Sequence, residues 1–241
     1  MPLSDAQSDR IREIFARFLE QRVRSLERLT LDHMKFNVVA LRATATMLEL
    51  DSPEALLRYR LAQHLERSLV TALGTAFQQA ARVIAGHGSG VAGADIEKVR
   101  EGRRYFIQVK SGPDTANRDI AQNIAALLNS ARARDPEAIC LLGVCYGRPE
   151  QMSSIARREL ETRGVGLRVG REFWAFIGNE PGTMGEVLEL AGQAAVAIEA
   201  GDERYGERVE PRLGALTAEF ERRYGRGLTE EAWQRFLVDN S

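Results

Sequence analysis

Apolar residues recur at a helical spacing in the first part of the chain. Between Ser4 and Leu29 they stand three or four positions apart, which predicts a long amphipathic helix. A second helical stretch begins at Ser52, a residue type that caps helices, followed by Pro53 in the first turn, where a proline is tolerated. This stretch is expected to extend, with at most one break, to Ala85, before the glycines of GHGSGVAG.

The middle of the chain carries strand patterns. ADIEKV and RYFIQVK, joined by REGR, predict a β-hairpin, and the apolar run AICLLGVCYG predicts a buried strand. GLRV predicts another short strand. One helix is expected at about 117–134, another is expected to begin at REFWAFIG, and two or three more are expected within 182–238. The segment 152–163 is ambiguous. This order predicts an α/β fold, a mixed central β-sheet flanked by helices with helical N- and C-terminal additions.

The length and hydropathy of the chain suit one domain. Its 241 residues, 44% of them hydrophobic, suffice for one core, and we expect a helical region at 1–50, an α/β core at 51–178 and a helical region at 179–241. No apolar run approaches the roughly 18 residues of a membrane span, and the first residues lack the order of a secretion signal. We therefore expect a cytoplasmic protein with no membrane partner.

Charge is distributed unevenly, although the net charge is -1. Residues 98–171, the central basic band, carry 14 basic and 8 acidic side chains, whereas residues 172–241 carry 7 and 14. A polyanion-binding surface leaves such a band in a sequence, and so does an ordinary solvated face. Only Lys35, Lys98 and Lys110 are lysine, and a lysine kept among so many arginines indicates a need for an amine that can lose its proton.

The cysteines and histidines exclude some metal sites. Cys140 and Cys145 lie in one apolar run, and His33, His64 and His87 are widely scattered. This pattern fits neither a disulfide scaffold nor a structural zinc site. Any metal is expected to be held by oxygen atoms.

One glycine motif is typical of nucleotide binding but stands in the wrong context. Gly88, Gly90 and Gly93 spell G-x-G-x-x-G. A dinucleotide site needs that motif after a strand and before a helix, because the phosphate lies at the helix N-terminus. Here a helix precedes it and a strand follows, so we expect a loop and no nucleotide cofactor.

Three polar residues of the hairpin form a candidate catalytic group. Asp95 lies near the start of the first strand, while Gln108 and Lys110 alternate on the second and so share one face. Phosphodiester hydrolysis needs a carboxylate and a second oxygen ligand for a divalent cation, and a positive group beside the charged transition state. The alternative is an exposed hairpin with ordinary surface charges.

Around these residues the chain resembles the PD-(D/E)xK nuclease superfamily and, more narrowly, type II restriction endonucleases of a PmeII-like group. The resemblance covers about residues 60–195 and departs from the superfamily at Ala94, where proline is usual, and at Gln108, where a carboxylate is usual. Three blocks carry it: Asp95 to Pro113 with QVKSGP, GVCYG at 143–147, and GREFW at 170–174.

This resemblance implies a single nuclease domain over 1–241 with its catalytic core at 51–178. It implies Mg²⁺-dependent hydrolysis of both strands of double-stranded DNA at a palindromic or interrupted palindromic site, of the GG…CC kind. A homodimer is expected, because a palindrome presents two equal half-sites. Asp95, Gln108 and the backbone carbonyl of Val109 would hold the metal, and Lys110 would act beside it.

Gln108 brings no negative charge, so another acid is a candidate ligand. Glu97 lies two residues from Asp95 on the same strand face, with a solvated hairpin charge as the alternative. Glu66 lies on the helix before the loop, where related nucleases often place a ligand, and we prefer it slightly.

The loop after Lys110 is the candidate DNA-binding segment. Asn117 is equally a candidate cap of the next helix. The residues expected to contact phosphates or bases are Ser111, Asp114, Thr115, Asn117, Arg118 and Arg148.

Two other functions share these residues. A repair, recombination or structure-specific nuclease would use the same Asp95, Gln108 and Lys110 without one recognition sequence. A non-catalytic DNA-binding protein with a decayed site is the second alternative, which Gln108 keeps open. In either nuclease we expect Lys110 to be essential and the loss of Lys35 or Lys98 to be nearly silent.

Overall fold

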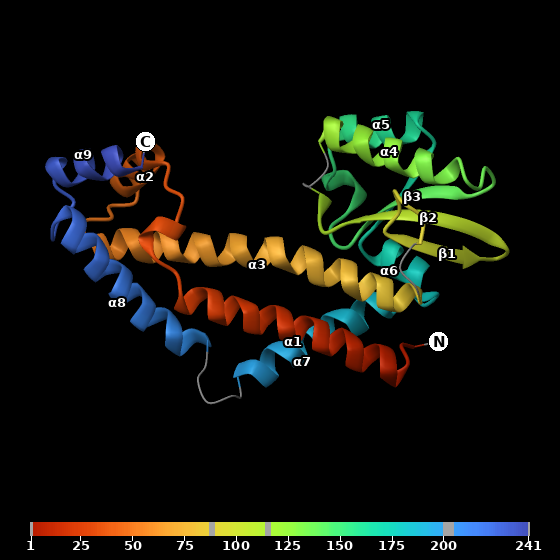
Figure 1. Cartoon of the computed structure of the whole chain (residues 1–241), viewed down its shortest axis with the longest axis horizontal. Helices are drawn as coiled ribbons and strands as arrows, with labels where there is room; N and C mark the ends of the chain where they lie inside the picture. Colours follow the sequence, from red (N-terminus) through yellow and green to blue (C-terminus); the bar gives the residue numbers. More distant parts are fainter. Residues whose placement is uncertain (1, 87–89, 114–116, 200–204, 241) are drawn as a thin grey trace. The chain divides into compact units, whose positions relative to one another are not determined.

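A computed structural model describes residues 2–86, 90–113, 117–199 and 205–240 (Figure 1). The chain divides into two compact units. Met1–Phe18 and Ala72–Val196 form the first unit, and Leu19–Thr71 and Ala197–Ser241 form the second. Helices α1 (Asp5–Glu27) and α3 (Pro53–Ala85) contribute residues to both. The expectation of a single nuclease domain over 1–241 stays a prediction.

The first unit contains a mixed sheet of four strands, as the sequence predicts. The hairpin pairs antiparallel, with Ile96 opposite Ile107, and the remaining neighbours pair parallel. In spatial order the strands are β1 (Ile96–Arg100), β2 (Arg103–Lys110), β3 (Ile139–Val144) and β4 (Val165–Val169).

Helices cover both faces of this sheet. Figure 1 shows α4 (Arg118–Arg132) and α5 (Ser154–Thr162) on one face and α6 (Arg171–Gly178) on the other, with α7 (Thr183–Glu199) following. The face toward α4 and α5 buries Phe106 of β2 and alternate residues of β3 and β4 in one apolar cluster. The ambiguous segment 152–163 is therefore helical in α5, because its Ala156 and Leu160 complete that cluster.

The second unit is helical. It contains η1 (Leu31–His33), α2 (Val38–Met47), the first part of α3, α8 (Tyr205–Tyr224) and α9 (Glu230–Asp239). Large apolar side chains of these helices form a core of their own, among them Leu57, Leu216, Phe220 and Phe236. Helix α3 continues without a break.

Helix α2 lies in the expected helical region 1–50, but the sequence pattern does not predict it as a separate helix. It buries only Val38, Leu41 and Ala45 and includes two threonines, so its apolar period is short and weak. The helix begins where the Asn37 side chain accepts a hydrogen bond from the Ala40 amide.

Both cysteines are buried and free. Burial raises the pKa of the Cys145 thiol well above its ordinary value, so this sulfur stays protonated and inert. Among the described helices, none has the length and apolar character needed to cross a membrane.

Lys98 corrects one expectation from the sequence. Its side chain is only 7% exposed, and its Nζ donates a hydrogen bond to the Ile177 carbonyl oxygen at 2.5 Å, near the end of α6. Burial lowers the pKa of this amine. Lys98 therefore joins β1 to α6, and we expect its loss to lower the stability of the fold.

We predict that Lys98→Ala lowers the free energy of unfolding by about 1–3 kcal/mol, because the Ile177 carbonyl loses a charged donor. Chemical denaturation measures this change. The control is Lys35→Ala, which removes an exposed lysine and is expected to stay within about 0.5 kcal/mol of the parent protein. Equal stability of the two variants would contradict the structural role.

Candidate active site at the end of strand β2

Asp95 is fixed to the edge of β2 by its backbone and its side chain. Its amide donates to the Ile107 carbonyl oxygen at 2.8 Å, and its Oδ2 accepts from the Val109 amide at 2.9 Å. The carboxylate thus takes the place that a longer β1 would fill. Gln108 lies between Ile107 and Val109 on β2, the two residues that Asp95 contacts, so two predicted site residues lie at this end of the hairpin.

Gln108 anchors the loop that precedes Asp95. Its Nε2 donates to the Gly93 carbonyl oxygen at 2.9 Å. Because a carbonyl oxygen only accepts, this contact fixes the orientation of the amide and leaves Oε1 as its other polar atom. The NH₂ group of Gln108 thus donates to the backbone of the preceding loop.

Gly93 explains part of the glycine motif without any nucleotide. Its φ of +98° favours glycine, and a Cβ atom at this position would lie 2.4 Å from the Leu127 carbonyl oxygen of α4. The loop is therefore held against α4 just before Asp95. Gly90 has open space around it, and Gly88 and His87 lie outside the described residues.

Two residues that the sequence analysis missed contact the same strand end. Arg82 of α3 forms an ion pair with Asp95, its Nη2 lying 3.1 Å from Oδ1. Gln78, one turn earlier, donates through Nε2 to the Val109 carbonyl oxygen at 2.9 Å. The only signal in the sequence is their spacing of four on one flank of a helix that otherwise buries Phe77, Ala80 and Ala81.

Lys110 closes β2. It is half-buried and lies on the same face of the strand as Gln108. Its carbonyl oxygen accepts from the Cys145 amide at 2.9 Å, which extends the pairing with β3. Among the described residues, none forms a hydrogen bond or ion pair with its ammonium group.

The three sequence blocks of the resemblance meet around this strand end. The Trp174 ring Nε1 donates to the Cys145 carbonyl oxygen at 2.7 Å, which joins GREFW to GVCYG. At four glycines in these blocks the backbone lies so close to a neighbouring residue that an added Cβ atom would be within 3 Å of it. These pairs are Gly112 with Tyr146, Gly147 with Pro113, Gly170 with the Gly147 carbonyl and Gly143 with Phe173.

The two candidate extra acids lie in different surroundings. Glu97 pairs with Arg104 at 3.3 Å, and Arg104 also pairs with Asp135 at 3.3 Å, so the Glu97 carboxylate already has a cationic partner. Glu66 is an exposed residue of α3 that belongs to the second unit. Its role as a ligand stays a prediction.

The predicted DNA-binding residues have mixed surroundings. The Asn117 side chain accepts from the Ile120 amide at 2.9 Å and caps α4, which confirms the capping alternative. Ser111 packs against α3, where a Cβ atom at Gly74 would lie 3.1 Å from its Oγ. Arg118, which is exposed, pairs with Glu159 at 3.7 Å, Arg148 is exposed, and Asp114 and Thr115 lie outside the described residues.

The oxygen atoms at the end of β2 suit a hard divalent cation. Asp95 offers a carboxylate, Gln108 an amide oxygen and Val109 a backbone carbonyl, and Mg²⁺ favours such oxygen ligands together with water. In the described part of the chain, this strand end included, no group of three or more carboxylate, thiol or imidazole side chains gathers as a metal site. The donors therefore fit Mg²⁺, with only one negative charge among them.

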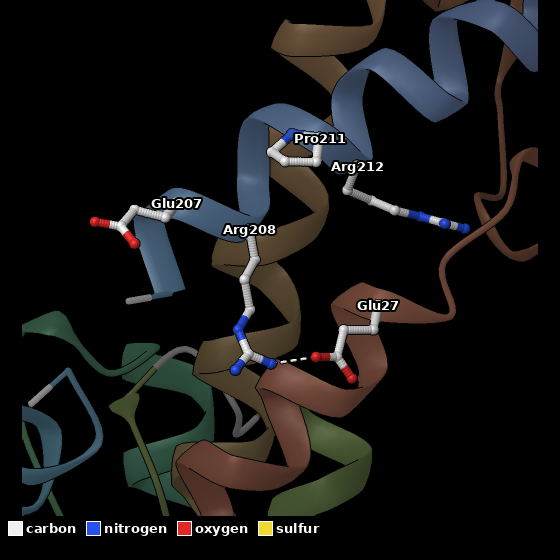
Figure 2. Close-up of a pocket in the computed structure, with 5 residues that line it drawn as sticks. All are labelled: Glu27, Glu207, Arg208, Pro211 and Arg212. Carbon is white, nitrogen blue, oxygen red and sulfur yellow. Dashed lines mark hydrogen bonds and ion pairs between the residues drawn. The ribbon is translucent and has the colours of Figure 1, made fainter. Parts of the chain in front are cut away.

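A pocket in the second unit lacks these features. It encloses about 440 Å³ between α1 and α8 and is lined by Glu27, Glu207, Arg208, Pro211 and Arg212 (Figure 2). Arg208 points to Glu27 and pairs with it, while Glu207 points away. The two glutamates and two arginines that line this pocket cancel in charge, so the pocket has no net charge that would favour an ion. The end of β2 is therefore the better candidate site.

The mixed sheet with helices on both faces, and Asp95, Gln108 and Lys110 at a strand end, define a restriction-endonuclease-like fold. The family model of the type II restriction endonuclease EcoO109I matches residues 6–199. The chain therefore belongs to this family, which acts on DNA. A comparison with curated proteins finds no match.

We predict that Gly93→Ala destabilises the protein by about 1–3 kcal/mol and lowers any activity of the site, because a side chain is strained at positive φ and meets the Leu127 carbonyl. Thermal unfolding measures the change. Gly90→Ala is the matched control in the same loop, and it should unfold like the parent protein. The role given to Gly93 is wrong if both variants melt alike.

Proposed function

We propose that this chain is a Mg²⁺-dependent type II restriction endonuclease that hydrolyses both strands of double-stranded DNA at a short palindromic or interrupted palindromic site. The observation that carries this proposal is the gathering of Asp95, Gln108, the Val109 carbonyl and Lys110 at one strand end in a chain of this family. We further propose a cytoplasmic homodimer of the PmeII-like group with a GG…CC type of site.

Asp95, Gln108 and the Val109 carbonyl would hold the cation. When bound, Mg²⁺ would supply Lewis-acid stabilisation of the charged transition state and acidify the attacking water. Asp95 provides the single negative charge, and the Val109 amide keeps its carboxylate in place. Lys110 lies on the same strand face as Gln108 and would steady the attacking water and the charge on the phosphate through its amine.

Symmetry supports the proposed homodimer. A palindrome presents the same half-site twice, and two copies of one chain related by a two-fold axis match it. The helical regions at 1–50 and 179–241 are the candidate interfaces.

A digest of long duplex DNA with Mg²⁺ tests the proposal. We expect discrete fragments whose mapped ends share one short symmetric sequence. Cleavage of branched DNA without such a sequence would instead support a repair or structure-specific nuclease. Salt-sensitive DNA binding with no cleavage in Mg²⁺ or Mn²⁺ would support the decayed, non-catalytic alternative.

We predict that Lys110→Ala abolishes detectable cleavage, a loss of at least about 10²-fold, because its amine acts on the transition state. DNA affinity and thermal stability should change little, as one amine is a small part of backbone binding. Cleavage assays with DNA-binding assays separate the two effects. The exposed Lys35→Ala is the control, and an equal loss in both variants would remove the reason for assigning Lys110.

We predict that the central basic band binds the phosphate backbone. The logarithm of the binding constant should fall with the logarithm of salt concentration by about 0.9 per phosphate contact. A flat response between low and moderate ionic strength would contradict this prediction. The arginines of the band that we propose for these contacts are some of Arg118, Arg132, Arg134, Arg148, Arg157 and Arg158.

We predict that Gln108→Glu keeps cleavage and lowers the Mg²⁺ concentration needed for half-maximal rate, because a negative charge replaces a neutral ligand. Without metal the variant should lose about 1–3 kcal/mol of stability, since its carboxylate faces the Gly93 carbonyl. Gln108→Leu removes both polar atoms and should need more Mg²⁺. A folded Gln108→Glu protein that is inactive at every Mg²⁺ concentration would show that Gln108 is not a simple replacement for a metal-binding carboxylate.

A further inference from the structure

Helix α3 presents two polar side chains to the proposed metal site. Gln78 and Arg82 are one helical turn apart, and the neighbouring residues Ala76, Phe77, Ala80 and Ala81 are buried. These buried residues hold this part of α3 in the core of the first unit, to which it belongs. The flank with Gln78 and Arg82 is consequently held at the end of β2.

Two of the proposed oxygen ligands, the Asp95 carboxylate and the Val109 carbonyl, already have donors from the protein. Arg82 Nη2 lies 3.1 Å from Asp95 Oδ1, and the Val109 amide donates to Oδ2 at 2.9 Å. Gln78 Nε2 donates to the Val109 carbonyl oxygen at 2.9 Å. Two donors from one helix thus occupy the acceptors that a cation would use.

We propose that Arg82 is a positioning residue that serves as a built-in counter-cation, neutralising Asp95 when no metal is bound and competing with the incoming divalent cation. Gln78 satisfies the Val109 carbonyl in the same state without adding charge. This inference rests on the proposed function, since it takes Asp95 and Val109 as the metal ligands.

Charge explains why Arg82 must compete. Asp95 is the only carboxylate among Asp95, Gln108 and the Val109 carbonyl, and its ion pair with Arg82 balances that charge. A dication arriving at Asp95 meets a guanidinium that cannot lose its proton, and the repulsion is relieved only by movement of the arginine. The Arg82 side chain is 44% exposed and Asp95 22%, so the arginine has solvent to move into.

Metal binding without DNA tests this inference apart from cleavage. The probe is Mn²⁺, which suits the same oxygen ligands, with its free form measured by electron paramagnetic resonance and Mg²⁺ as competitor. We expect Arg82→Gln to bind Mn²⁺ more tightly, on the order of tenfold, because one repelling charge is gone. The same variant should melt at a lower temperature without metal, and Arg82→Lys should bind Mn²⁺ nearly as the parent protein does.

The matched control is Arg163→Gln. Arg163 is also 44% exposed and also pairs with a carboxylate, that of Glu159, so its loss tests for general effects of removing an ion pair. Its Mn²⁺ affinity should be unchanged. Asp95→Asn is the control for the site itself and should lose Mn²⁺ binding.

The outcomes separate the inference from the proposed function. Unchanged or weaker Mn²⁺ binding in Arg82→Gln, together with loss of binding in Asp95→Asn, would overturn the role of Arg82 and leave the metal site standing. Mn²⁺ binding by Asp95→Asn equal to that of the parent protein would overturn the metal site.

A measurement on the parent protein covers the case in which Arg82→Gln does not fold. The nitrogen resonance of the Arg82 Nε–H group should shift on addition of Mg²⁺, because the guanidinium leaves Asp95. The resonance of Arg163 should stay in place. An unmoved Arg82 resonance at Mg²⁺ concentrations that saturate the site would contradict the inference.

Discussion

The site depends on one constraint: strand β1 begins only at Ile96, so it does not extend along the end of β2. Pairing with β2 starts at Ile96, so the Val109 amide and carbonyl face an edge without a strand partner. Backbone polar groups that are removed from water need partners, and here the Asp95 carboxylate and the Gln78 amide provide them. Because side chains replace a strand at this edge, the Asp95 carboxylate and the Val109 carbonyl oxygen lie together with two donors from α3, Gln78 and Arg82.

The surrounding loops hold this edge in position by close contact. Before Asp95, the Gly93 carbonyl accepts a hydrogen bond from Gln108, and Gly93 packs closely against α4. After Lys110, Gly112 packs closely against the Tyr146 ring. Such approaches exclude a Cβ atom, which gives the glycines of the motifs a physical reason. The residues proposed for chemistry therefore lie between two closely packed positions, Gly93 and Gly112, as a preorganised site requires.

Much of the fold and part of the site could be predicted from local patterns. Strand alternation identified the hairpin, and the spacing of Gln108 and Lys110 put them on one face. Gln78 and Arg82 could not be found in this way, since their partners lie 31 and 13 residues away and a polar helix flank normally indicates solvent. The buried contact of Lys98 cannot be read from the local pattern for a similar reason, because its carbonyl partner, Ile177, lies 79 residues later.

The central claim is that a divalent cation binds at the edge of β2 between Asp95 and the Val109 carbonyl. A crystal structure of the protein grown with Mn²⁺, with anomalous scattering data, tests it most directly. The account predicts an anomalous peak bound by Asp95 and the Val109 carbonyl oxygen, with Arg82 moved away from the carboxylate. A saturated crystal whose peak lies elsewhere, for example at Glu97 and Asp135, with the Asp95 and Arg82 pair intact, would contradict it.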